Sequence, residues 1–190
     1  MRTPSQPKED VIEKLGEAFR RLGYEGATLA KLSLATGLQK ASLYHYFPGG
    51  KEDMARAVLD QINGVIQEHV IQPLRSNSPP QDRLKQTVKA VDQFYDGGKL
   101  NCLIGIFILS ASHKLFETDV RLMLKGWIAA LAEVGVAMGV KADVAYQRAQ
   151  QWVTELQGAL IITRGLGSKS VFRRTLNRLP EVILGAGNAN

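Results

Sequence analysis

The sequence predicts an all-α protein. Apolar residues recur at the three- and four-residue spacing of helices through most of the chain, and no stretch alternates apolar and polar residues between turn signals as a strand would. The chain has 190 residues, of which 45% are hydrophobic, so it can bury one or two cores. We therefore expect a folded helical protein of one or two domains.

The first three predicted helices form a small module. The first spans residues 7–23, where a proline suits the start and a glycine the end. The second spans 28–36, and the Thr28 hydroxyl can cap its free backbone N–H groups. After a turn at Gly37, a short third helix spans 40–46. Two short helices joined in this way indicate a helix-turn-helix, whose second helix reads base edges in the DNA major groove.

A long fourth helix is predicted to connect this module to the rest of the chain. An apolar stripe runs along residues 51–72, and Pro73 is expected to end the helix. After a Ser/Pro-rich linker, five further helical stretches follow near 81–96, 101–113, 118–139, 142–165 and 169–184. We therefore predict two domains, residues 1–50 and residues 51–190.

Bulk charge gives little support for DNA binding. The formal net charge is +6, but residues 1–75 hold ten Lys/Arg and nine Asp/Glu, so the half with the helix-turn-helix is nearly neutral. Individual positions carry more weight, because Lys40 lies in the motif and Lys51 just after it.

Residues 8–60 resemble the amino-terminal domain of TetR-family transcriptional regulators. The shared features are a capping threonine, a glycine followed by an apolar residue at the turn, an aromatic end to the third helix and a Lys-Glu pair that begins the fourth. In this sequence they are Thr28, Leu32, Gly37-Leu38, Leu43-Tyr44-His45-Tyr46-Phe47 and Lys51-Glu52. The junction at 47–51 and the segment 156–164 are similar to the LmrA/YxaF-like branch of this family.

The resemblance implies a helix-turn-helix DNA-binding domain followed by a helical ligand-binding and dimerisation domain. It also implies that seven residues contact a double-stranded DNA operator. Side chains at the start of the third helix can meet base edges, and hydroxyl, phenol, imidazole and ammonium groups can hold phosphates. These residues are Thr28, Lys40, Ala41, Ser42, Tyr44, His45 and Lys51.

A homodimer is expected because one recognition helix covers only a few base pairs, and two copies on a palindrome provide specificity. The last two helices offer broad apolar faces for the interface. Their candidate residues are Trp152, Val153, Leu156, Gly158, Ala159, Leu160, Val171, Phe172, Leu176 and Leu179. The alternative is that these residues only complete the core of one protomer.

The resemblance further implies that the middle helices bind a small-molecule effector, which acts through the fourth helix and releases a repressor from DNA. Aromatic walls with a few polar groups suit an apolar or aromatic ligand. The candidate residues are Phe94, Tyr95, Asn101, Phe107, His113, Trp127 and Trp152.

Three other functions are possible for a chain of this composition. A redox-responsive regulator would use Cys102, the single cysteine, and a helical protein-binding adaptor would have no DNA role. An enzyme is not expected, because Cys102 and His113 lie eleven residues apart, about 16 Å along a continuous helix, which is too far for a nucleophile and its base. We predict no catalytic residue, no metal site and no cofactor. Without an apolar signal core or a membrane-spanning run, a cytoplasmic location and no membrane partner are expected.

Overall fold

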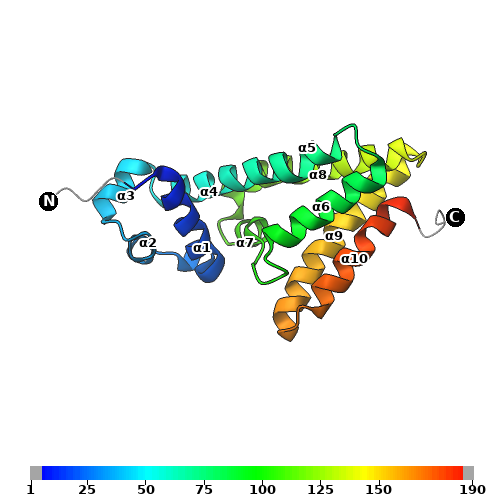
Figure 1. The fold of residues 1–190 in the computed structure, drawn as a ribbon. Helices are drawn as coiled ribbons and strands as arrows, with labels where there is room; N and C mark the ends of the chain where they lie inside the picture. Colours follow the sequence, from blue (N-terminus) through cyan, green and yellow to red (C-terminus); the bar gives the residue numbers. More distant parts are fainter. Residues whose placement is uncertain (1–5, 186–190) are drawn as a thin grey trace. The chain divides into compact units, whose positions relative to one another are not determined.

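The computed structural model describes residues 6–185, which form helices and turns without a strand (Figure 1). The predicted all-α fold is therefore confirmed. By their contacts the residues fall into two compact units, which we call the first and the second unit. The first contains the chain up to residue 63 together with 103–120, and the second contains 64–102 together with the chain from residue 121.

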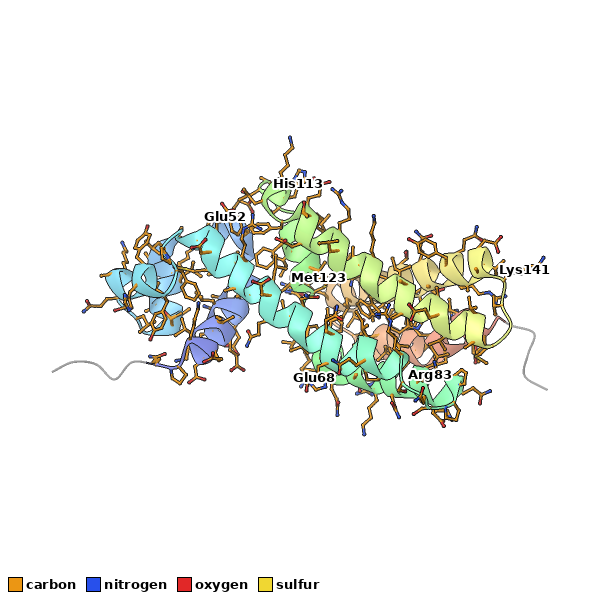
Figure 2. The ribbon with its side chains drawn as sticks, turned by 90° about the horizontal axis from the view of Figure 1, so that it is seen from above. Glu52, Glu68, Arg83, His113, Met123 and Lys141 are labelled. Atoms are coloured by element: carbon orange, nitrogen blue, oxygen red, sulfur yellow. The ribbon has the colours of Figure 1, made fainter. Side chains whose placement is uncertain are left out.

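The first unit holds the three amino-terminal helices, the start of α4 and a later segment that contains α7. The bounds are α1 Lys8–Gly26, α2 Leu29–Thr36, α3 Lys40–Tyr46, α4 Lys51–Ile66, α7 Leu103–Ile108 and the 3-10 turn η2 His113–Leu115. Figure 2 marks Glu52 in the first turn of α4 and His113 at the start of η2. Helix α1 ends three residues later than predicted, although its dihedral angles are non-helical at Gly23 (φ 68°, ψ 171°).

An aromatic cluster forms the part of the first unit that joins α1 to the segment 103–120. Phe107 lies 5.3 Å from Phe19 and 4.9 Å from Phe116 between ring centroids, and Tyr24 lies 4.9 Å from Phe116. Because Phe107 and Phe116 are both buried here, the chain must turn between them, and the Ser110 hydroxyl donates to the Phe107 carbonyl at 2.8 Å. The helix predicted over 101–113 is consequently much shorter in the structure.

Arg56 ties α4 to the same segment of the first unit. Its guanidinium donates to Asp119 Oδ2 at 2.6 Å, to the Leu115 carbonyl at 2.7 Å and to Glu52 Oε1 at 2.9 Å. The hydrogen bond that Arg56 donates to Glu52, opposed by partial burial, raises the pKa of Arg56 above its ordinary value, and the charge of Asp119 adds to the effect. The helix-turn-helix, the start of α4 and residues 103–120 are thus packed and hydrogen-bonded as one body.

The second unit contains the remaining helices. Their bounds are the π-helical turn η1 Gln67–Ile71, α5 Gln72–Leu74, α6 Pro80–Phe94, α8 Glu117–Ala137, α9 Ala142–Leu166 and α10 Ser170–Leu184, with the end of α4 and most of α8 assigned to this unit. Pro73 was expected to end the fourth helix, but the chain stays helical through η1 and α5 to Leu74. Pro73 lies directly after the π turn, where the regular i→i−4 hydrogen-bond pattern is interrupted, so its missing N–H is tolerated there.

Polar contacts fix several helix ends of the second unit. Arg75, just after α5, makes a two-pronged hydrogen bond to Glu133 of α8, with both N···O distances 2.8 Å. Arg148 of α9 donates to the carbonyls of Ile183 and Leu184 at 3.1 and 3.0 Å, and so provides hydrogen-bond donors for the last carbonyl groups of α10. Over residues 6–185, every helix is too short or too polar to cross a bilayer.

Two glycines are expected to respond oppositely to alanine. Gly37 ends α2 with φ 71°, in the left-handed region, whereas Gly64 lies within α4, and an added Cβ at either would meet nothing within 4 Å. We expect Gly37→Ala to lower the free energy of unfolding by about 1–2 kcal/mol through backbone strain. Gly64→Ala should raise it by about 0.5–1 kcal/mol. Urea denaturation of both variants checks this, and a stabilised Gly37→Ala protein would contradict the turn geometry.

Candidate DNA-binding surface and ligand-binding region

The turn between α2 and α3 is held by short side-chain hydrogen bonds. The Thr36 hydroxyl donates to the Leu32 carbonyl at 2.8 Å, and the Ser33 hydroxyl donates to the Leu38 carbonyl at 2.5 Å. At the other end of α2, the Lys31 N–H donates to Thr28 Oγ1 at 3.4 Å, so Thr28 is the predicted N-cap. These bonds fix the angle at which α3 leaves the turn.

Helix α3 has one buried and one exposed face. Leu43 is fully buried, and Phe47 follows it into the core. On the opposite face, the exposed residues recur at positions i, i+1, i+4 and i+5. These are Lys40, Ala41, Tyr44 and His45. The exposed face therefore presents a cation, a methyl group, a phenol and an imidazole on a single turn and a half of helix.

The start of α3 is left open to a ligand. Gln39 occupies the N-cap position and makes no side-chain capping hydrogen bond, as its residue type predicts. Ser42 is half-buried, while Thr28 at the start of α2 is exposed. The free backbone N–H groups of these two helix starts favour anions such as DNA phosphates.

Tyr44 is held close to the turn before α4. It is 49% exposed, and a Cβ added at Gly50 would lie 3.4 Å from Tyr44 Cε1, so the ring packs beside this glycine. Gly50 has φ 70°, and the Gly49 N–H donates to Asp53 Oδ2 at 2.6 Å. The ring of Tyr44 is thereby placed beside a well-defined turn, while about half of the residue remains exposed.

Lys51 is oriented differently from the other predicted DNA contacts. Its Nζ donates to the Tyr24 carbonyl at 3.1 Å and lies 4.2 Å from the Tyr24 ring centroid, which is a cation–π contact. Burial, together with the carboxylates of Glu52 and Glu25, raises the pKa of Tyr24, which favours the neutral phenol beside this cation. In this structure Lys51 serves the contact between α1 and α4, and a phosphate contact would have to share its ammonium.

The seven candidate ligand residues are distributed over both units. Trp127 and Trp152 are in contact in the second unit, 5.5 Å apart between ring centroids. Tyr95 is buried there too, contacts Phe94 and Phe172, and its hydroxyl donates to Cys102 Sγ at 3.3 Å. Asn101 is half-buried. The other two candidates belong to the first unit, where Phe107 is part of the aromatic cluster and His113 is exposed.

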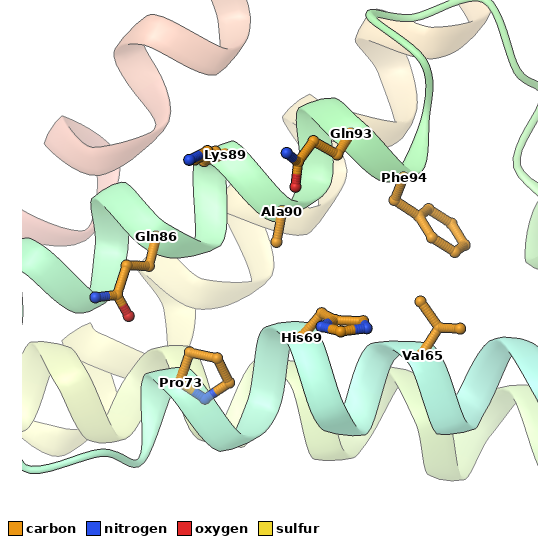
Figure 3. Close-up of a pocket in the computed structure, with 8 residues that line it drawn as sticks. All are labelled: Val65, His69, Pro73, Gln86, Lys89, Ala90, Gln93 and Phe94. Atoms are coloured by element: carbon orange, nitrogen blue, oxygen red, sulfur yellow. The ribbon is translucent and has the colours of Figure 1, made fainter.

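A groove in the second unit was not foreseen from the sequence. It has a volume of about 490 Å³ and lies between α6 and the helix that passes through the π turn (Figure 3). Its lining residues are Val65, His69, Pro73, Gln86, Lys89, Ala90, Gln93 and Phe94. Only Phe94 was among the candidates, because the pairing of α6 with the π turn is a tertiary contact that helical periodicity does not encode.

Neither a reactive cysteine nor a group of metal-ligating side chains is found in the described part of the chain. Cys102 is buried against the Tyr95 hydroxyl, unlike the exposed, electropositive surroundings that make a thiol reactive. Among residues 6–185, no three His, Cys, Asp or Glu side chains are grouped so that they could hold a metal ion.

Comparison with known proteins finds one family and several relatives that agree with it. Residues 12–58 match the family described as "Bacterial regulatory proteins, tetR family". The HTH-type transcriptional regulator YxaF of Bacillus subtilis is 20% identical over 187 residues, covering 96% of this chain and 98% of YxaF. The HTH-type transcriptional regulator LmrA of the same organism is 26% identical over 82 residues, 43% of this chain and 44% of LmrA.

A solved structure shows the same fold. A TetR transcriptional regulator from Legionella pneumophila superposes with a TM-score of 0.82 at 19% identity, covering 95% of this chain and 98% of that protein. The helix-turn-helix at residues 12–58, the similarity to YxaF and LmrA, and this fold agree with one another. Residues 12–58 thus form a helix-turn-helix domain of the TetR family, and over nearly its whole length the chain is similar to transcriptional regulators of that family.

Proposed function

We propose that this protein represses transcription by binding a palindromic DNA operator as a homodimer, and that a small apolar or aromatic ligand releases it. The observation that carries the DNA contact is the exposed face of α3, on which Lys40, Ala41, Tyr44 and His45 stand together opposite the buried Leu43. A dimer that covers an operator excludes other proteins from that DNA, which favours repression. Functionally, residues 1–50 act as the DNA-binding domain, and residues 51–190 as the ligand-binding and dimerisation domain.

Base reading is assigned to Lys40, Ala41 and Ser42, and phosphate binding to Thr28, Tyr44 and His45. Lysine can donate to guanine acceptors, and the alanine methyl can contact thymine. A phenol or an imidazole donor to phosphate fixes the register of α3 without reading sequence. Lys51 contributes positive charge at the start of α4 while it holds Tyr24.

Two substitutions separate these roles. We expect Tyr44→Ala to weaken binding to all DNA sequences to a similar degree. Lys40→Ala should cost about 1–3 kcal/mol and also relax the base preference at one position of each half-site. Fluorescence anisotropy with labelled operator and with single-base variants of it measures both effects.

The matched control is Lys85→Ala, which removes an exposed lysine of α6 in the second unit. It should leave the affinity and the base preference unchanged. Unchanged affinity in both the Tyr44 and Lys40 variants would refute the assignment of α3 as the recognition helix.

The dimer interface is assigned to the last two helices, with the contact centred on the exposed face of α9. Of the ten apolar residues that the sequence suggested for this role, all except Gly158 and Val171 are buried within the second unit. Because these eight side chains are already buried within one protomer, the proposal centres the contact on apolar residues of α9 that remain exposed. Near its carboxyl end, α9 exposes Ile161, Ile162 and Leu166, at 64%, 50% and 68% exposure.

The geometry of α9 favours a close helix contact at this face. Gly158 and Gly165 lie beside the exposed isoleucines, and an added Cβ at either glycine would meet nothing within 4 Å. Small residues let a second helix approach, and apolar neighbours stabilise the contact once it forms. In a two-fold dimer this face would pack against its own copy.

Ligand release requires energetic coupling between the ligand and DNA. Helix α4 is continuous from Lys51 to Ile66, and its residues belong to both units, so it is the element assigned to carry the coupling. The factor by which ligand weakens DNA binding must equal the factor by which DNA weakens ligand binding. Equal ligand affinity of free and operator-bound protein, measured by calorimetry, would contradict this part of the proposal.

A further inference from the structure

Two indole groups in the second unit are buried without a hydrogen-bond partner. Trp127 of α8 is 2% exposed and Trp152 of α9 is 0% exposed. The rings meet edge to face, with centroids 5.5 Å apart and an interplanar angle of 64°. Within residues 6–185, neither Nε1 atom has an acceptor in hydrogen-bonding range.

A buried indole N–H without an acceptor is stronger evidence for a missing ligand than most other unpaired polar groups. Its N–H is a donor only, and buried tryptophan normally places this group against an acceptor. Two other buried polar atoms of the described chain also lack partners, Thr87 Oγ1 and Gln157 Nε2. A hydroxyl can rotate and can accept as well as donate, whereas each indole N–H has one direction and one role.

Other buried polar groups of the same unit do have partners. The Tyr95 hydroxyl donates to Cys102 Sγ at 3.3 Å, and Thr163 Oγ1 accepts the Phe172 N–H at 3.1 Å. Thr87 Oγ1 and Gln157 Nε2 of this unit lack partners as well, so the two indoles are distinguished by being donors only and by their contact with each other.

The charge of the surroundings restricts the kind of acceptor. The buried polar residues of the described chain are Thr36, Thr87 and Thr163, and no charged side chain among residues 6–185 is buried. An anion beside the indoles would thus lack a buried counter-charge, and its desolvation would oppose binding. A neutral oxygen acceptor avoids this penalty.

We propose that Trp127 and Trp152 form the effector site, and that the effector is a neutral, largely apolar molecule whose carbonyl oxygen accepts a hydrogen bond from an indole N–H. This inference rests on the proposed ligand-responsive function and specifies its chemical class. The carbonyl supplies the acceptor that the buried donors lack, and the apolar body of the ligand suits the aromatic surroundings.

The chain contains two tryptophans, so a nitrogen–proton correlation NMR spectrum shows two indole signals. The full-length protein is titrated with indanone, with indane, which lacks the carbonyl oxygen, and with indanecarboxylate, which carries a negative charge. Indanone should bind about tenfold more tightly than indane, because it pairs a buried donor. It should also move at least one indole proton downfield, and indanecarboxylate should bind more weakly than indanone.

Trp127→Phe and Trp152→Phe assign the two signals, and removing the donor that binds the carbonyl should abolish the preference for indanone over indane. If either variant does not fold, the comparison of the three probes on the wild-type protein still decides the question. Equal affinity for indanone and indane, indole signals that do not respond, or tighter binding of indanecarboxylate would overturn the inference. An upfield indole proton in the free protein would also overturn it, since the N–H would then point at the neighbouring ring.

The same wild-type protein is tested for operator binding, which keeps the two proposals distinguishable. Operator binding with unresponsive indoles refutes only the tryptophan site. Absence of operator binding refutes the proposed function, while the probe titration still reports on the site by itself.

Discussion

Replacing Ile161 and Ile162 together by glutamate is expected to dissociate the proposed homodimer and to abolish the proposed high-affinity binding to an operator. Both side chains are largely exposed on α9, and in a two-fold interface each charge would be brought near its own copy. Burying carboxylates without partners should raise the dimer Kd by at least about a hundredfold. Sedimentation equilibrium measures the change, from twice the chain mass of 20.9 kDa to the single mass.

The control for this double variant is Leu122→Glu, which adds a carboxylate at a residue of α8 that is 65% exposed. It should leave the dimer intact, and circular dichroism should show unchanged helix content in both proteins. A double variant that remains dimeric would place the interface elsewhere. Equal dissociation by Leu122→Glu would show that the interface is not centred on α9.

Phe107→Ala is expected to lower the free energy of unfolding by about 3–5 kcal/mol, the usual range for deleting a fully buried phenylalanine. The ring is 0% exposed and contacts both Phe19 of α1 and Phe116 after η2. Its removal leaves a cavity where the segment 103–120 packs on the amino-terminal helices.

The control is Leu109→Ala, one residue after α7, at a side chain that is 81% exposed. That substitution should change the free energy of unfolding by less than about 0.5 kcal/mol. Urea denaturation followed by circular dichroism compares the two variants. A loss below about 1 kcal/mol for Phe107→Ala would contradict the aromatic cluster, because a buried phenylalanine usually contributes about 3–5 kcal/mol.

Features of the fold that depend on local sequence could be predicted. Apolar spacing located the helices, the Thr28 hydroxyl caps α2 as its position suggested, and Gly37 adopts the left-handed conformation required at the end of that helix. Each of these depends on residues within a turn or two of helix. Local patterns are therefore sufficient to establish them.

Features that depend on distant residues could not be predicted. Phe107 was selected as a ligand residue because it is aromatic, but its neighbours Phe19 and Phe116 place it in the core of the first unit. Lys51 was selected for its charge at a helix start, yet the Tyr24 carbonyl and ring hold its ammonium. The sequence positions of Phe107 and Lys51 do not show which distant residues they contact in the folded chain.

The apolar helix faces show the same limit. Periodicity identified Trp152, Leu156 and Leu176 as members of apolar stripes, but it does not say whether a stripe is covered by the same chain or by a second copy. The π turn could not be predicted from the sequence either, because a single extra residue in one turn changes the 3.6-residue apolar pattern very little.

The most direct test of DNA recognition is selection of bound duplexes from a random pool by the full-length protein, repeated at two salt concentrations. We predict enrichment of a near-palindrome whose half-site centres lie about 34–36 Å apart, or a multiple of that distance, with affinity that falls steeply as salt increases. The Lys40→Ala protein should select the same palindrome with one relaxed position in each half-site. Enrichment of no sequence, or of a single unrepeated site, would contradict the proposal that this chain reads an operator as a homodimer through α3.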